Sequence, residues 1–98
     1  MESRWHPRFE VDQPATIMTK SANRPRPAVI KNYSMGGLFL ETPIDLARHQ
    51  FLLINIPHNG GSTLLRGMVI HTPGTGVGVE VENRFWPRLL GWKESHCA

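Results

Sequence analysis

The stretch GVGVEVE at residues 76–82 constrains the fold more than any other part of this 98-residue chain. Its valines, Val77, Val79 and Val81, alternate with glycine and glutamate. Successive side chains of a β-strand point to opposite faces, so the valines share one face and the glycines and glutamates share the other. The pattern predicts a strand with one face on a hydrophobic core.

Other short apolar segments are separated by turn residues. Pro14 interrupts a loosely alternating segment, as is tolerated on an edge strand or at a bulge. The Asn-Gly and Gly-Gly steps of HNGGS (residues 58–62) predict a hairpin. About six short antiparallel strands without a long helix predict an all-β barrel or sandwich. The expected strands are 8–19, 27–32, 37–41, 51–57, 63–72 and 76–82.

Helix is expected only in short pieces. Residues 45–49 are predicted to form at most one or two helical turns, and a short helix is predicted near 85–92. We expect one face of this helix to close the barrel end, and the other to be buried as well or to form a docking or dimer contact. Phe85, Leu89 and Trp92 would share one face, and Trp86 and Leu90 another.

The length of the chain fits one domain with a single core. The longest apolar run, residues 51–56, is far shorter than a membrane span. The N-terminal residues carry charges and a proline where a signal peptide needs an apolar segment. The only cysteine, Cys97, rules out an internal disulfide. We therefore expect a cytoplasmic protein.

Charge is distributed unevenly along the chain. Six of the eleven basic residues but only three of the eight acidic residues precede residue 35. This surplus predicts an anionic partner for the first third of the chain. It is much smaller than the dense basic stripe of a general DNA-binding protein.

Several site classes are disfavoured. The glycines of GTGVGVEV (residues 74–81) precede a strand, whereas a dinucleotide-binding loop leads into a helix. The five histidines have no short paired spacing and no CxxC accompanies them, so no metal site is expected. Neither a nucleophile elbow nor an acid/base carboxylate pair stands out, so no catalytic residue or enzymatic activity is expected.

Two short motifs remain. Arg4 and Arg8 flank Pro7, which disfavours a helix, so their backbone positions would lie roughly 13 Å apart in an extended segment. Such a pair suits a ligand that carries several negative charges. In KNYSMGG (residues 31–37), two small polar residues are followed by glycines that permit positive φ or close approach of a ligand.

Together the motifs resemble those of the PilZ domain family, whose signature is RxxxR followed by (D/N)xSxxG. That family is a six-stranded antiparallel β-barrel that binds the bacterial second messenger cyclic di-GMP. Both motifs match at every fixed position, and the later strands follow in the family's order. The resemblance implies one PilZ-type barrel domain over 1–98. We expect a flexible ligand-clamping arm at 1–8, the barrel at 9–82, and a short helix and tail at 83–98.

The resemblance also implies roles for the motif residues. Arg4 and Arg8 would hold phosphates and guanine edges, since the guanidinium fork matches both. Asn32 and Ser34 would bond guanine or phosphate, and Gly37 would keep the turn open. Further candidate contacts are Trp5, His6, Gly36 and His71, the last standing where some family members have a tryptophan that stacks on a base.

The expected function is that of a stand-alone cyclic di-GMP receptor that relays the signal to an unidentified protein by a conformational change. No other cofactor is expected. One alternative is a PilZ-like interaction module that binds no nucleotide. Another is a small-barrel RNA or single-stranded DNA binder, which is disfavoured because the tryptophans lie near the chain ends rather than on strands. The number of ligand molecules, and whether the chain is a monomer or a homodimer, stay open.

Overall fold

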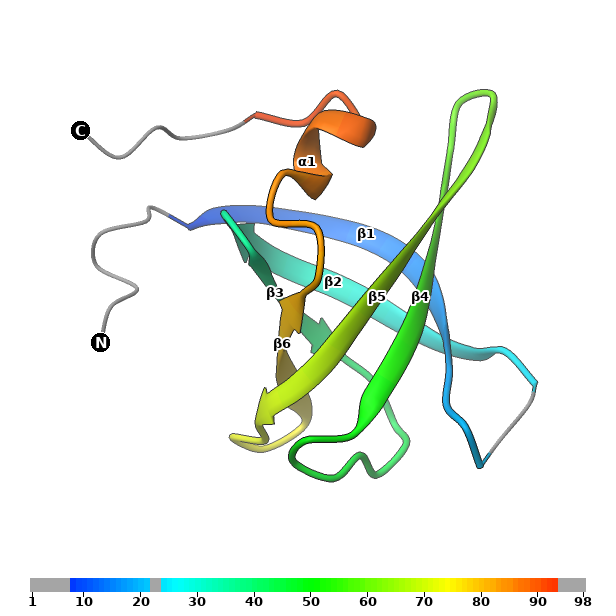
Figure 1. Ribbon diagram of the computed structural model, residues 1–98, viewed down its shortest axis with the longest axis vertical. Coiled ribbons are helices and arrows are strands. Elements are labelled where there is room, and N and C mark those ends of the chain that lie inside the picture. Colours follow the sequence, from blue (N-terminus) through cyan, green and yellow to red (C-terminus); the bar gives the residue numbers. More distant parts are fainter. Residues whose placement is uncertain (1–7, 22–23, 94–98) are drawn as a thin grey trace.

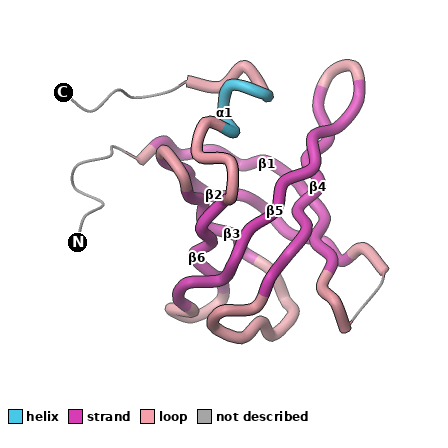
Figure 2. Tube along the Cα trace, in the orientation of Figure 1, coloured by secondary structure: helices cyan, strands magenta, loops and turns pink. Residues whose placement is uncertain are grey.

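A computed structural model describes residues 8–21 and 24–93, which form a closed antiparallel β-barrel with one short helix (Figures 1 and 2). The strand order around the barrel is β1-β2-β3-β6-β5-β4. The predicted all-β barrel with a short C-terminal helix is therefore confirmed. The elements are β1 (Phe9–Met18), β2 (Arg26–Ser34), β3 (Gly37–Glu41), β4 (Phe51–His58), β5 (Gly61–His71), β6 (Gly76–Val81) and α1 (Trp86–Leu89).

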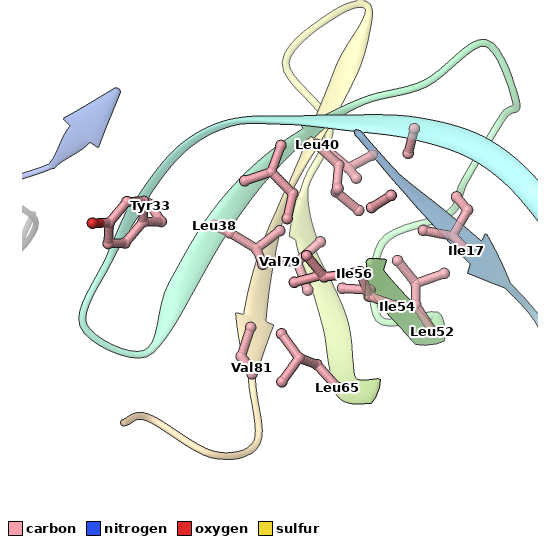
Figure 3. Packing of buried hydrophobic residues seen from close by; sticks show 14 of the residues in the cluster. Ile17, Tyr33, Leu38, Leu40, Leu52, Ile54, Ile56, Leu65, Val79 and Val81 are labelled. Carbon is pink, nitrogen blue, oxygen red and sulfur yellow. The ribbon is translucent and has the colours of Figure 1, made fainter. Parts of the chain in front are cut away.

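Aliphatic side chains from all six strands fill the barrel. On β6 the valines predicted to face the core are buried, with Val79 only 1% exposed. On β4 the alternation buries Ile54 and Ile56 completely. Figure 3 shows these side chains meeting Leu38 and Leu40 of β3 in the interior. Burial of apolar surface at about 25 cal/mol per Å² is the main force that holds the strands together.

An aromatic cluster closes the end of the barrel where β1 begins and β2 ends. Tyr33 lies with its ring centroid 5.3 Å from Phe9, 5.5 Å from Trp86 and 4.9 Å from Trp92. Its hydroxyl donates a hydrogen bond of 2.8 Å to the carbonyl of Lys93. We call Phe9, Tyr33, Trp86 and Trp92 the aromatic cap. The helix α1, which contributes Trp86, lies over this end of the barrel (Figure 1).

The C-terminal helix is shorter than predicted. It covers only Trp86–Leu89, and the chain then turns through Gly91, whose φ is +70°. Because helical periodicity stops there, Trp92 does not share a face with Phe85 and Leu89 as expected; it joins the aromatic cap instead. Phe85 and Leu89 stay 44% and 53% exposed.

The loop between β3 and β4 contains no helical turn at residues 45–49. The amide of Gln50 donates to the carbonyl of Ala47 at 3.1 Å, which closes a turn. His49 occupies the left-handed region of that turn at φ +73°. A residue at positive φ is incompatible with a right-handed helix, so the segment is a turn only.

Two local predictions are confirmed: the hairpin between β4 and β5, and the position of Pro14 in β1. Residues Asn59 and Gly60 connect β4 to β5, with His58 paired to Gly61. Pro14 pairs with β2, whereas the pairing of β1 with β4 begins only at Thr16, so the proline lies where β1 has one strand neighbour.

Candidate functional site

Two rows of paired residues cross the outer face of β2, β3, β6 and β5. Neighbouring strands lie about 4.8 Å apart, so each row brings distant parts of the sequence within roughly 15 Å. The first row consists of Ser34, Gly37, Glu80 and Met68, and the second of Asn32, Phe39, Gly78 and His71.

Two β-bulges turn the polar members of the second row outward. Ile30 and Val69 are fully buried, and strict alternation would place the residues two positions later inside the barrel as well. The register shifts between Ile30 and Asn32, and again between Val69 and His71. Because each bulge adds one residue to its strand, Asn32 and His71 lie on the outer face.

Glycines of β6 form the floor between these side chains. A Cβ atom at Gly78 would lie 2.7 Å from Nε2 and 2.8 Å from Cε1 of His71, so the imidazole ring lies directly over this glycine. The neighbouring residues Val77 and Val79 point the other way and are buried. The glycine–valine alternation thus builds the core on one face and clears room for aromatic rings on the other.

Arg8 is held at one end of the two rows. Its Nε donates a hydrogen bond of 2.8 Å to Oδ1 of Asn32, and its Nη1 donates one of 3.5 Å to Oγ of Ser34. Partial burial of the guanidinium lowers the pKa of Arg8 from its ordinary value, but an arginine in a protein stays protonated. No carboxylate of residues 8–21 or 24–93 forms an ion pair with it. Its charge is therefore available to an external anion.

The turn after Ser34 anchors the end of β2, the strand that carries both hydrogen-bond acceptors of Arg8. Gly36 has φ +81°, a conformation that only glycine adopts readily. Its amide donates to the carbonyl of Arg84 at 3.2 Å, and its carbonyl accepts from the amide of Val81 at 2.8 Å. The turn is thus tied to the end of β6 and to the segment that leads into α1.

A cavity of about 750 Å³ lies over this surface. The predicted site residues Arg8, Asn32, Ser34, Gly37 and His71 all line it, as does Gly36. The other predicted contacts, Arg4, Trp5 and His6, lie outside the described residues. The remaining lining residues are Met35, Leu38, Phe39, Ile70, Gly78, Val79 and Glu80.

Phe39 and Glu80 are two of the lining residues that sequence reasoning missed. Alternation in β3 and β6 places both on the outer face, and that signal was present in the sequence. Their position at the cavity depends on β3 pairing with β6 rather than with the next strand along the chain. Local sequence patterns do not contain this pairing.

Within the described part of the chain, no cluster of three or more His, Cys, Asp or Glu residues is arranged to hold a metal ion. The described residues also include no helix with the length and apolar character needed to cross a membrane.

A closed six-stranded barrel with an outer cavity that Arg8 lines defines the class of domain, and comparison with known proteins identifies the family. The PilZ domain family model matches residues 2–85. The chain therefore belongs to the PilZ domain family, as the two motifs predicted. Domains of this family are generally cyclic di-GMP receptors.

The fold agrees with a solved structure of the same family. The crystal structure of the PilZ domain of CeSA from a cellulose-synthesizing bacterium is similar with a TM-score of 0.68 and 16% sequence identity. The similarity covers 87% of this chain and 95% of that one. No curated protein matches the sequence.

Proposed function

We propose that this chain is a receptor for cyclic di-GMP that binds the dinucleotide in the cavity over β2, β3, β6 and β5. The observation that carries the proposal is the arrangement of Arg8, whose guanidinium is oriented by Asn32 and Ser34 at the cavity edge. Family membership supports the choice of ligand. An oriented guanidinium fits a phosphate or the O6/N7 edge of guanine with two parallel hydrogen bonds.

The cavity offers both kinds of contact that a nucleotide needs. Arg8 supplies positive charge at one end, and Arg4 would add a second cation from the preceding segment. His71 and Phe39 present rings on the cavity wall, and a base can stack on an imidazole or a phenyl ring. Gly37 leaves part of the floor free of a side chain, while the imidazole of His71 covers Gly78.

The same residues suggest how ligand binding changes the surface that a partner protein contacts. Tyr33 stands between Asn32 and Ser34 in the sequence but points to the opposite face, where it contacts Trp86 of α1 and Trp92. A ligand that moves the backbone at Asn32 or Ser34 therefore also shifts the aromatic cap. The exposed side chains Phe85 and Leu89, beside the cap, would present this change to a protein partner.

Isothermal titration calorimetry of the purified chain tests the proposal. Cyclic di-GMP should bind with a dissociation constant on the order of micromolar, about −8 kcal/mol, and cyclic di-AMP should bind at least tenfold more weakly. Arg8→Ala and Arg4→Ala should each reduce the affinity for cyclic di-GMP. Absence of cyclic di-GMP binding would instead favour an interaction module without a nucleotide, and preferential binding of a single-stranded oligonucleotide would favour the third alternative.

A further inference from the structure

The cavity proposed for an anionic ligand contains a carboxylate, that of Glu80. Glu80 lies on β6, directly opposite Gly37 of β3 and Met68 of β5, and its side chain is exposed. None of the described lysines or arginines forms an ion pair with it. A carboxylate repels phosphate, so this end of the cavity does not suit the phosphates of a cyclic dinucleotide.

A carboxylate does suit one edge of guanine. The Watson–Crick edge of guanine presents two adjacent donors, N1–H and the 2-amino group, and a carboxylate has two acceptor oxygens that can take both bonds. Adenine presents an unprotonated ring nitrogen at the corresponding position, which a carboxylate repels. Asn32 cannot fulfil this role alone, because its single acceptor oxygen already accepts one bond from Arg8 and has one lone pair left for two donors.

The cross-strand register places Glu80 across the cavity from Arg8, where it could bind the other edge of a guanine held by Arg8. Ser34, Gly37 and Glu80 form one row, so two strand spacings, about 10 Å, separate the strand that carries the acceptors of Arg8 from the strand that carries Glu80. Gly37 lies between them without a side chain. A guanine over Gly37 would meet the Arg8 fork at its O6/N7 edge and the Glu80 carboxylate at its N1–H and 2-amino edge.

We therefore propose that Glu80 is a specificity-determining residue, which selects guanine by accepting hydrogen bonds from N1–H and the 2-amino group of one base. This inference rests on the proposed function, because it assigns a role to Glu80 in the same cavity. It makes a definite statement about ligand orientation: one base lies between Arg8 and Glu80, with its N1–H and 2-amino edge at Glu80, and the phosphates lie away from Glu80.

The test compares ligands that differ at the 2-amino group. Calorimetric titrations with cyclic di-GMP and with cyclic di-IMP, whose bases lack that group, are run on the wild type, Glu80→Gln and Glu41→Gln. Glu41 is a matched control, since it is an exposed carboxylate on the outer face of the barrel, on β3, but does not line the cavity. Both substitutions remove one negative charge and leave the side-chain size unchanged.

We expect the wild type and Glu41→Gln to prefer cyclic di-GMP over cyclic di-IMP by about tenfold or more, the effect of losing a hydrogen bond to a charged group. Glu80→Gln should bind cyclic di-GMP about tenfold more weakly and should largely lose this preference. If Glu80→Gln binds both ligands as Glu41→Gln does, or binds cyclic di-GMP more tightly, the assignment of Glu80 is wrong although the proposed function stands. If the wild type does not bind cyclic di-GMP, the proposed function fails and the role of Glu80 fails with it.

Discussion

Replacing Arg8 by lysine is expected to weaken cyclic di-GMP binding by about 10- to 100-fold without disturbing the fold. Nε and Nη1 of Arg8 donate to Asn32 and Ser34, which fixes the plane of the guanidinium at the edge of the cavity. Lysine keeps the positive charge but has one ammonium group without a planar fork. A lost hydrogen bond to a charged group costs about 1.5–3 kcal/mol, and 1.4 kcal/mol corresponds to tenfold in affinity.

The stability of the fold should hardly change in the same variant. Arg8 precedes β1, contributes nothing to the aliphatic core and is exposed, so the free energy of unfolding should shift by no more than about 0.5 kcal/mol. Calorimetry measures the affinity, and urea denaturation measures the stability of the same samples. Arg66→Lys is the control, because Arg66 pairs with Glu82 on the outer surface and does not line the cavity. Equal affinities of the two lysine variants would refute the reasoning.

Four further substitutions test the fold. Gly36→Ala should lower the free energy of unfolding by about 1–2 kcal/mol, because φ is +81° there; an unchanged urea midpoint would contradict this. Trp86→Ala should cost about 3–5 kcal/mol, since the indole is fully buried, whereas Leu89→Ala at an exposed position of the same helix should cost less than about 0.5 kcal/mol. The hydrogen bond and ion pair with Asp12 raise the pKa of Lys31 above its ordinary 10.5. The contribution of this pair to the free energy of unfolding is therefore complete below pH 10.5 and is lost as the pH rises through the higher pKa of the folded state. The difference in unfolding free energy between wild type and Lys31→Met should therefore stay constant near neutral pH and shrink in strongly alkaline solution; a difference that grows with pH would show that the pair does not stabilise the fold.

Local patterns were sufficient to predict an all-β fold, and the family resemblance selected the barrel over a sandwich. The valines of β6 and the Asn59–Gly60 turn are features of neighbouring residues, and local geometry decides them. The length of α1 was not predictable in this way. The apolar residues from Phe85 to Trp92 fit a helical period, but packing of Trp92 against Tyr33 competes with continuation of the helix.

Within the candidate site, the sequence predicted mainly the residues that belong to the two motifs. Arg8, Asn32 and Ser34 were assigned from the family signature, and the hydrogen bonds between them agree with that assignment. Phe39 and Glu80 were missed because their place at the cavity depends on the pairing of β3 with β6, a contact between segments about forty residues apart. The outward orientation of His71 also depends on a bulge, and no sequence signal for that bulge was recognised.

The position of Tyr33 connects the ligand site with the rest of the molecule. Asn32 and Ser34 belong to the motif and face the cavity, while Tyr33 between them faces the aromatic cap and donates a hydrogen bond to the carbonyl of Lys93. A displacement of a few tenths of an ångström at Asn32 cannot be absorbed by Tyr33 alone, because its ring is packed against Phe9, Trp86 and Trp92 at once. Tyr33 therefore links the backbone of the cavity-lining residues to the placement of α1. In the proposed function, this contact would let a small rigid barrel report an occupied cavity at the end that the aromatic cap covers.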